Sequence, residues 1–73
     1  MPRLHSGKKI VKALTRLGFI IISQKGSHIK LRRLRKGVLY TVIVPAHKEV
    51  AFGTLQSIVR QAGITRNELE ENI

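Results

Sequence analysis

Three short apolar segments, separated only by glycine-containing turns, most constrain what this chain can fold into. Residues 19–24 (FIIISQ), 28–34 (HIKLRRL) and 38–44 (VLYTVIV) are rich in β-branched and aliphatic residues. Segments of this kind favour β-strands. The connections KGS and RKG are short enough for hairpins, so the segments predict an antiparallel sheet in which each strand pairs with the next.

Two amphipathic helices are predicted to flank these strands. Ser6 fits a helix N-cap, apolar residues follow it at helical spacing, and Gly18 fits the C-cap of a helix over residues 7–17. Thr54 is predicted to cap a second helix that ends at the next glycine. The sequence TRNE at residues 65–68 matches a capping box and predicts one further helical turn.

The order α-β-β-β-α predicts a single α+β domain over residues 1–73, a three-stranded antiparallel sheet with both helices on one face. A chain this short has a small core, so any site is expected to be a shallow surface feature. A period of two places His28, Lys30 and Arg32 on one side of the middle segment. Because cations rarely lie in a core without partners, we expect that side to face solvent.

Positive charge is concentrated in the first two-thirds of the chain. The formal net charge is +10, and residues 1–48 contain no Asp or Glu. This imbalance predicts a polyanionic partner, with nucleic acid as the first candidate and a role in solubility alone as the alternative. The sequence contains no cysteine, no apolar run of membrane-spanning length and no secretory signal. A cytoplasmic protein without disulfides or a membrane partner is therefore expected.

His28 is the candidate catalytic residue. RNA carries its own nucleophile, the 2′-hydroxyl, and an imidazole can remove its proton near neutral pH. The residues predicted to hold the RNA are Lys25, Gly26, Ser27, Lys30 and Arg32. No metal or other cofactor is expected, because the four acids lie late in the chain. The alternative for His28 is a surface strand residue without a catalytic role.

The remaining histidines and the aromatic residues are weaker candidates. His47, in the loop VPAHKE, could be an accessory acid if the loop folds back, but a loop residue that caps backbone groups is the preferred interpretation. His5 is expected to be a solvated terminal residue. Phe19 is expected in the core, and Phe52 is expected to attach the second helix to it. Tyr40 could lie in the core or stack on a base.

Four sequence pieces occur in order between about Ser6 and Leu69: a helix ending in LGF, the turn KGSH, the loop VP.H and the helix GTLQSIVRQAGI. Together they resemble the HicA family of small toxins from bacterial toxin–antitoxin pairs. The resemblance implies a double-stranded-RNA-binding-domain-like fold and an mRNA endonuclease held inactive by a HicB-type antitoxin. It also implies that His28, in the GSH motif, is catalytic. The family often has His or another bulky residue directly after this histidine, whereas Ile29 follows it here.

Together, the residues around His28 and the resemblance to the HicA family predict an endoribonuclease that uses metal-independent acid–base catalysis at His28. The resemblance implies that it is a toxin that cleaves mRNA and is inhibited by an acidic HicB-type antitoxin. A non-catalytic module that binds double-stranded RNA through its shape and phosphates is the main alternative. A basic structural protein of a larger ribonucleoprotein is a third, which the regular capped elements and the lack of a basic tail disfavour.

Overall fold

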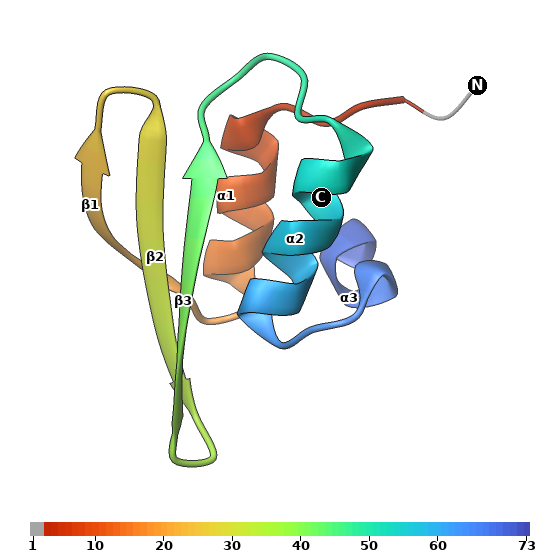
Figure 1. Ribbon diagram of the computed structural model, residues 1–73. Helices are drawn as coiled ribbons and strands as arrows, with labels where there is room; N and C mark the ends of the chain where they lie inside the picture. Colours follow the sequence, from red (N-terminus) through yellow and green to blue (C-terminus); the bar gives the residue numbers. More distant parts are fainter. Residues whose placement is uncertain (1–2) are drawn as a thin grey trace.

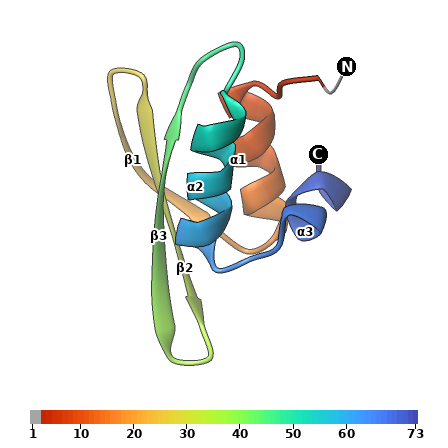
Figure 2. The same ribbon diagram turned by 45° about the vertical axis from the view of Figure 1, so that its right-hand side comes forward.

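The computed structural model describes residues 3–73, which form three helices and three strands (Figure 1). These elements follow the order α1 (Gly7–Arg16), β1 (Ile20–Lys25), β2 (His28–Arg35), β3 (Val38–Pro45), α2 (Phe52–Ala62) and α3 (Arg66–Glu71). The strands form one antiparallel sheet in the order β1-β2-β3, and all three helices lie on the same side of it (Figure 2). The predicted α+β class and element order are confirmed.

The first helix has the ends that its sequence predicts. The Ser6 hydroxyl oxygen accepts a hydrogen bond from the Lys9 amide at 3.2 Å and so caps the start of α1. At the other end, Gly18 has a φ of 103°, and the Phe19 amide donates to the Leu14 carbonyl at 3.0 Å. This closure is a Schellman motif, which satisfies a helix carbonyl and turns the chain into β1.

No helix in the described part of the chain is long and apolar enough to cross a membrane.

The start of α2 differs from the prediction. Thr54 is not the N-cap, because the helix begins at Phe52 and Ala51 holds the cap position without a side-chain hydrogen bond. The Ala51 carbonyl accepts from the Leu55 amide at 2.9 Å, so backbone bonding alone begins this helix. Phe52 is also not a core residue. Its side chain is 37% exposed, and the Arg66 guanidinium lies 5.3 Å from its ring centre in a cation–π contact.

The three strands match the predicted segments to within one residue at each end. A two-residue turn joins β2 to β3, and Lys36 (φ 50°) and Gly37 (φ 77°) are both left-handed. This is the pattern of a type I′ turn, whose twist matches that of the flanking strands. The β2–β3 hairpin extends well beyond the ends of the helices (Figure 1).

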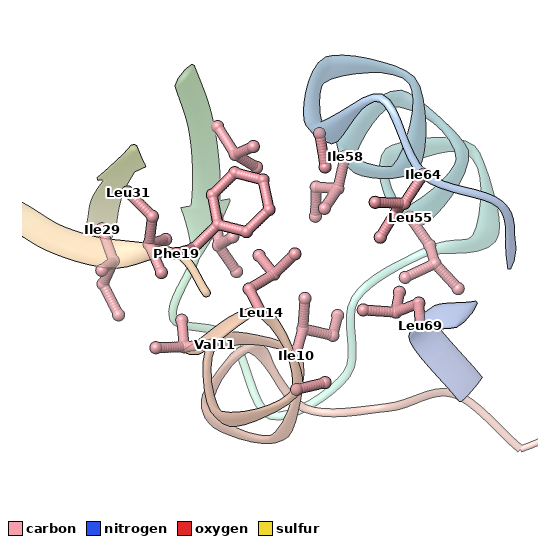
Figure 3. Close-up of a cluster of buried hydrophobic side chains, with 14 of the residues drawn as sticks. Ile10, Val11, Leu14, Phe19, Ile29, Leu31, Leu55, Ile58, Ile64 and Leu69 are labelled. Carbon is pink, nitrogen blue, oxygen red and sulfur yellow. The ribbon is translucent and has the colours of Figure 1, made fainter. Parts of the chain in front are cut away.

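The core lies between the helices and the inner face of the sheet (Figure 3). Ile29 and Leu31 point inward from β2, and Phe19 joins them as predicted. The buried hydrophobic residues are Ile10, Val11, Ala13, Leu14, Phe19, Ile29, Leu31, Val42, Val44, Val50, Leu55, Ile58, Ala62, Ile64 and Leu69. Burial of these side chains on one face of the sheet leaves the other face, called the outer face below, free of covering helices.

The two edge strands of the sheet, β1 and β3, differ in how far the helices cover them. All six residues of β1 are exposed, and the helices lie away from this strand (Figure 1). At the opposite edge, the Gln61 side-chain oxygen of α2 accepts a hydrogen bond from the Ile43 amide of β3 at 3.0 Å. A free edge amide of β3 is thereby satisfied within the fold, whereas β1 remains open to a partner.

The third helix begins with the predicted capping box. The Thr65 hydroxyl accepts from the Glu68 amide at 3.1 Å, and the Glu68 carboxylate accepts from the Thr65 amide at 2.9 Å. The hydrogen bond from the Thr65 amide, followed by that with the Thr65 side chain, lowers the pKa of Glu68 because both favour the ionised carboxylate. Leu69 is fully buried and attaches α3 to the core.

Gly7 allows a close approach between α1 and the loop after β3. A Cβ at this position would overlap the Pro45 carbonyl oxygen and lie 2.9 Å from the Ala46 Cα. We expect Gly7→Ala to lower the free energy of unfolding by about 1–3 kcal/mol, as overpacking does. Thermal unfolding followed by circular dichroism measures the loss. Gly53→Ala is the control, because a Cβ there meets no atom within 4 Å and should not lower stability. An unchanged melting temperature for Gly7→Ala would contradict the expectation.

Glu68 makes part of the stability dependent on pH. Its folded-state pKa lies below its unfolded value, so its charge stabilises the fold above the unfolded pKa and stops doing so as pH falls through the folded pKa. Glu68→Gln keeps a cap but removes the charge. We expect its melting temperature to lie below that of wild type at neutral pH and the gap to close in acid. Glu71→Gln, outside the capping box, is the control, and a gap that widened in acid would refute this account.

Candidate active site

His28 is the first residue of β2 and lies exposed on the outer face. The strand register places it opposite Lys25 on β1 and Pro45 on β3. The turn that precedes it consists of Gly26 and Ser27, and Gly26 has a φ of 56°, a left-handed conformation that favours glycine. The solvent exposure of His28, predicted from the alternation of β2, is confirmed.

An open hollow of about 180 Å³ lies beside the His28 side chain on the outer face. Its lining residues are Ser23, Lys25, His28, Lys30 and Ile43. Lys25 and Lys30 are thus brought together with the imidazole, while the rest of the wall is a hydroxyl and an aliphatic side chain. The hollow can accept an anionic group beside one proton acceptor and two ammonium groups.

A β-bulge brings Ser23 into this hollow. In β1, Ile21 lies opposite Leu31, whereas Ser23 lies opposite Lys30, so one extra residue interrupts the pairing between them. The extra residue changes the phase of the alternation, and both Ile20 and Ser23 therefore lie on the outer face. The three consecutive isoleucines before Ser23 do not indicate where the inward–outward alternation of β1 changes. Sequence reasoning therefore did not place Ser23 in the hollow.

Ile43 is the second lining residue that sequence reasoning missed. It lies opposite Lys30 on the neighbouring strand. This pairing follows from the two-residue turn at residues 36–37, because antiparallel partners on either side of such a turn are equally far from it. Counting outward from the turn would have placed Ile43 in the site.

Arg32 lies on the outer face but outside the hollow. It is opposite Thr41, and its Nε donates to the Thr41 hydroxyl at 3.3 Å. Arg32 lies four positions after His28 in β2, a distance of about 13 Å along a strand. The cations predicted to hold RNA therefore form two groups, Lys25 and Lys30 beside the imidazole and Arg32 farther along β2.

His47 also lies outside the hollow. It follows β3 in an exposed loop, and its carbonyl oxygen accepts a hydrogen bond from the Gly7 amide at 2.8 Å. This bond directs the loop toward α1, and the hollow beside His28 is lined without it. The preferred interpretation of His47, as a loop residue that satisfies backbone groups, is supported through its carbonyl rather than its ring.

His5 corrects the expectation of a solvated terminal residue. Its Nε2 lies 2.7 Å from the Glu70 carboxylate of α3, and its side chain is only 20% exposed. Its carbonyl oxygen accepts from the Val50 amide at 2.8 Å. The residue was misjudged because both partners are distant in sequence. His5 thus connects the N-terminal segment to α3 and to the loop before α2. It does not line the hollow beside His28.

Aromatic rings are absent from the outer face of the described sheet. Tyr40 is on the inner face, where its ring packs against Gly63 so closely that a Cβ on that glycine would lie 2.9 Å from Tyr40 Cδ1. Phe19 is buried, and the Arg33 guanidinium lies 5.8 Å from its ring centre. Bases of a bound RNA would therefore have no aromatic platform here, and contacts with phosphate would dominate.

Within residues 3–73, no carboxylate forms an ion pair with a cation of β1 or β2. The ion pairs join Glu70 to His5 and to Arg66. No group of three His, Asp or Glu side chains in this part of the chain could hold a metal ion. The outer face is therefore an uncompensated positive surface with one exposed imidazole, an arrangement suited to a phosphodiester.

Comparison with known proteins identifies the family. The model of the family described as HicA toxin of bacterial toxin-antitoxin matches residues 7–64, from the first residue of α1 to just beyond the end of α2. A search of curated proteins found no match. The matched range contains the hollow, the turn before His28 and both long helices. The chain belongs to the HicA family of toxins from bacterial toxin–antitoxin pairs.

Proposed function

We propose that this toxin is an endoribonuclease that cleaves mRNA, with His28 as its catalytic residue. The observation that carries the proposal is the hollow on the outer face, which the exposed imidazole lines together with Lys25 and Lys30. The proposed chemistry requires RNA rather than DNA, because only RNA brings a 2′-hydroxyl nucleophile with it. The protein would act in the cytoplasm, where mRNA is found.

The proposed reaction needs only groups of the chain and of the RNA. His28 removes the proton of a 2′-hydroxyl, whose oxygen forms a bond to the adjacent phosphorus. The bond from phosphorus to the 5′-oxygen breaks, which leaves a cyclic phosphodiester on one fragment. The proton held by His28 passes to the departing 5′-oxygen, so the imidazole returns to its starting state.

The neighbouring groups stabilise the phosphate during this reaction. Lys25 and Lys30 line the same hollow as His28 and offset the negative charge that grows on the non-bridging oxygens. The turn of Gly26 and Ser27 positions the phosphate through its backbone and the serine hydroxyl. Arg32, about 13 Å farther along β2, would hold a phosphate farther along the RNA rather than the reacting one.

The catalytic role is tested with His28→Ala. We expect cleavage of RNA in EDTA to fall by about 100-fold or more, because general acid–base catalysis is lost. RNA affinity and melting temperature should change little, since the side chain is exposed. His47→Ala, which removes an exposed imidazole outside the hollow, is the matched control and should keep most of the activity. Expression of both variants in cells, scored by growth and mRNA integrity, repeats the comparison.

Cleavage at a comparable rate by purified His28→Ala protein would show that this mechanism is wrong. If wild-type protein bound RNA but did not cut it, the non-catalytic RNA-binding module would be the correct function instead.

We also propose that an acidic HicB-type antitoxin inhibits the toxin by docking on the outer face. Aliphatic side chains lie exposed beside the cations of that face: Ile20 is 67% exposed, Leu34 71% and Leu39 58%. Leu34 and Leu39 are cross-strand partners, and Ile20 lies opposite Arg32. An aliphatic centre with a cationic rim fits a partner with apolar residues and carboxylates. A partner that docks there and extends along β2 toward His28 would also cover the hollow.

The docking surface is tested with Leu34→Glu. Leu34 is six residues from His28, about 20 Å along the strand, so cleavage should continue while antitoxin affinity falls at least tenfold. Val38→Glu is the matched control, because Val38 lies on the same hairpin but on the inner face of the sheet. Calorimetric titration with the cognate antitoxin measures both affinities. Equal loss of affinity for the two variants, or none for Leu34→Glu, would exclude this surface.

A further inference from the structure

A second cationic surface lies on α1 and has no role in the site described above. Four residues form it, here called the α1 stripe: Lys8, Lys9, Lys12 and Arg16. All four are exposed, and they occupy the side of the helix opposite its buried residues. Lys9, Lys12 and Arg16 line an open hollow together with Ile73.

Repulsion within the α1 stripe opposes folding of the free protein, although Arg16 itself donates a hydrogen bond to the Asn72 carbonyl at 2.6 Å. Lys8, Lys12 and Arg16 follow one another at intervals of four residues, a spacing at which like charges destabilise a helix. Lys8 and Lys9 also lie in the first turn, where the helix dipole disfavours cations and where α1 has no acid. Within residues 3–73, no ion pair joins the stripe to a carboxylate. A bound polyanion would remove this repulsion.

The loop after β3 connects the α1 stripe to the hollow at His28. Pro45 lies opposite His28, and the Ala46 amide donates to the Ser27 carbonyl. The His47 carbonyl of this loop accepts a hydrogen bond from the amide of Gly7, the first residue of α1. The start of α1 and the β1–β2 turn lie at the same end of the molecule, with the loop between them (Figure 1). An RNA strand that leaves the hollow and crosses this loop would therefore approach the start of α1.

The composition of the α1 stripe favours phosphate over a protein partner. Three of its four residues are lysines, and the one exposed aliphatic side chain in its hollow is Ile73. The centres of protein interfaces are poor in lysine and rich in aromatic or aliphatic anchors. Flexible lysines spaced about 6 Å apart along a helix instead suit successive phosphates without regard to base sequence.

We propose that the α1 stripe binds phosphates of the same RNA molecule that enters the His28 hollow, outside the bond that is cut. The proposal rests on the proposed function, since it takes RNA as the ligand of the hollow. The stripe would supply affinity for long RNA without base specificity, and the loop at residues 45–48 would be the path between the two contacts.

The proposal is tested by neutralising Lys9 and Lys12 in the His28→Ala protein, which is expected to bind RNA without cutting it. The probes are a long, unstructured single-stranded RNA and a trinucleotide that can cover only the hollow. Lys9→Gln/Lys12→Gln should raise the Kd for the long RNA several-fold. It should also reduce the dependence of log Kd on log salt by about 0.7 per lysine. Binding of the trinucleotide and of the cognate antitoxin should not change.

The matched control is Arg60→Gln/Arg66→Gln, which removes the same charge from α2 and α3 and should change RNA binding little. Glutamine and lysine have similar helix propensities, and circular dichroism verifies that α1 is intact. An unchanged Kd and salt slope for the long RNA would overturn the role of the α1 stripe and leave the proposed function standing. Loss of antitoxin binding with unchanged RNA binding would also overturn it and assign the stripe to a protein partner. If the His28→Ala protein bound no RNA at all, the proposed function itself would fail.

Discussion

The alternation of side chains in β2 is the constraint on which the rest of the structure depends. Ile29 and Leu31 enter the core, and the same pleat turns His28 and Lys30 to the opposite face. Burial of the two aliphatic residues therefore determines where the imidazole and its neighbouring cation lie. A shift of one residue would place charge in the core, so the register is strongly specified.

The positive charge is distributed around this small core without acids to balance it. Cations of the outer face flank the hollow, and those of the α1 stripe cover the helix surface that faces away from the core. Three of the four acids lie on α3, and one of them, Glu70, forms the ion pairs with His5 and Arg66. Charge thus divides the molecule into a basic part that can meet phosphates and a short C-terminal helix that carries most of the acids.

Elements with a local physical signal were predicted well. Ser6, Gly18 and the capping box at Thr65 act within a few residues of themselves, and all three lie where expected. The prediction that Thr54 caps α2 was wrong, because a polar side chain is only one way to satisfy the free amides at a helix start. Backbone hydrogen bonding alone begins α2. The prediction that Phe52 packs into the core was wrong, because its hydrophobicity does not reveal that its ring can instead make a cation–π contact with Arg66.

By itself, the sequence determined the order of the elements, the inward and outward sides of β2 and the exposure of His28, because each follows from nearest neighbours and the period of two. Only the tertiary structure decided which groups share the hollow. Ser23 enters it through a bulge, and the His47 loop turns to α1 through a bond to Gly7. These outcomes depend on pairing between segments far apart in the chain, which no local pattern of residues records.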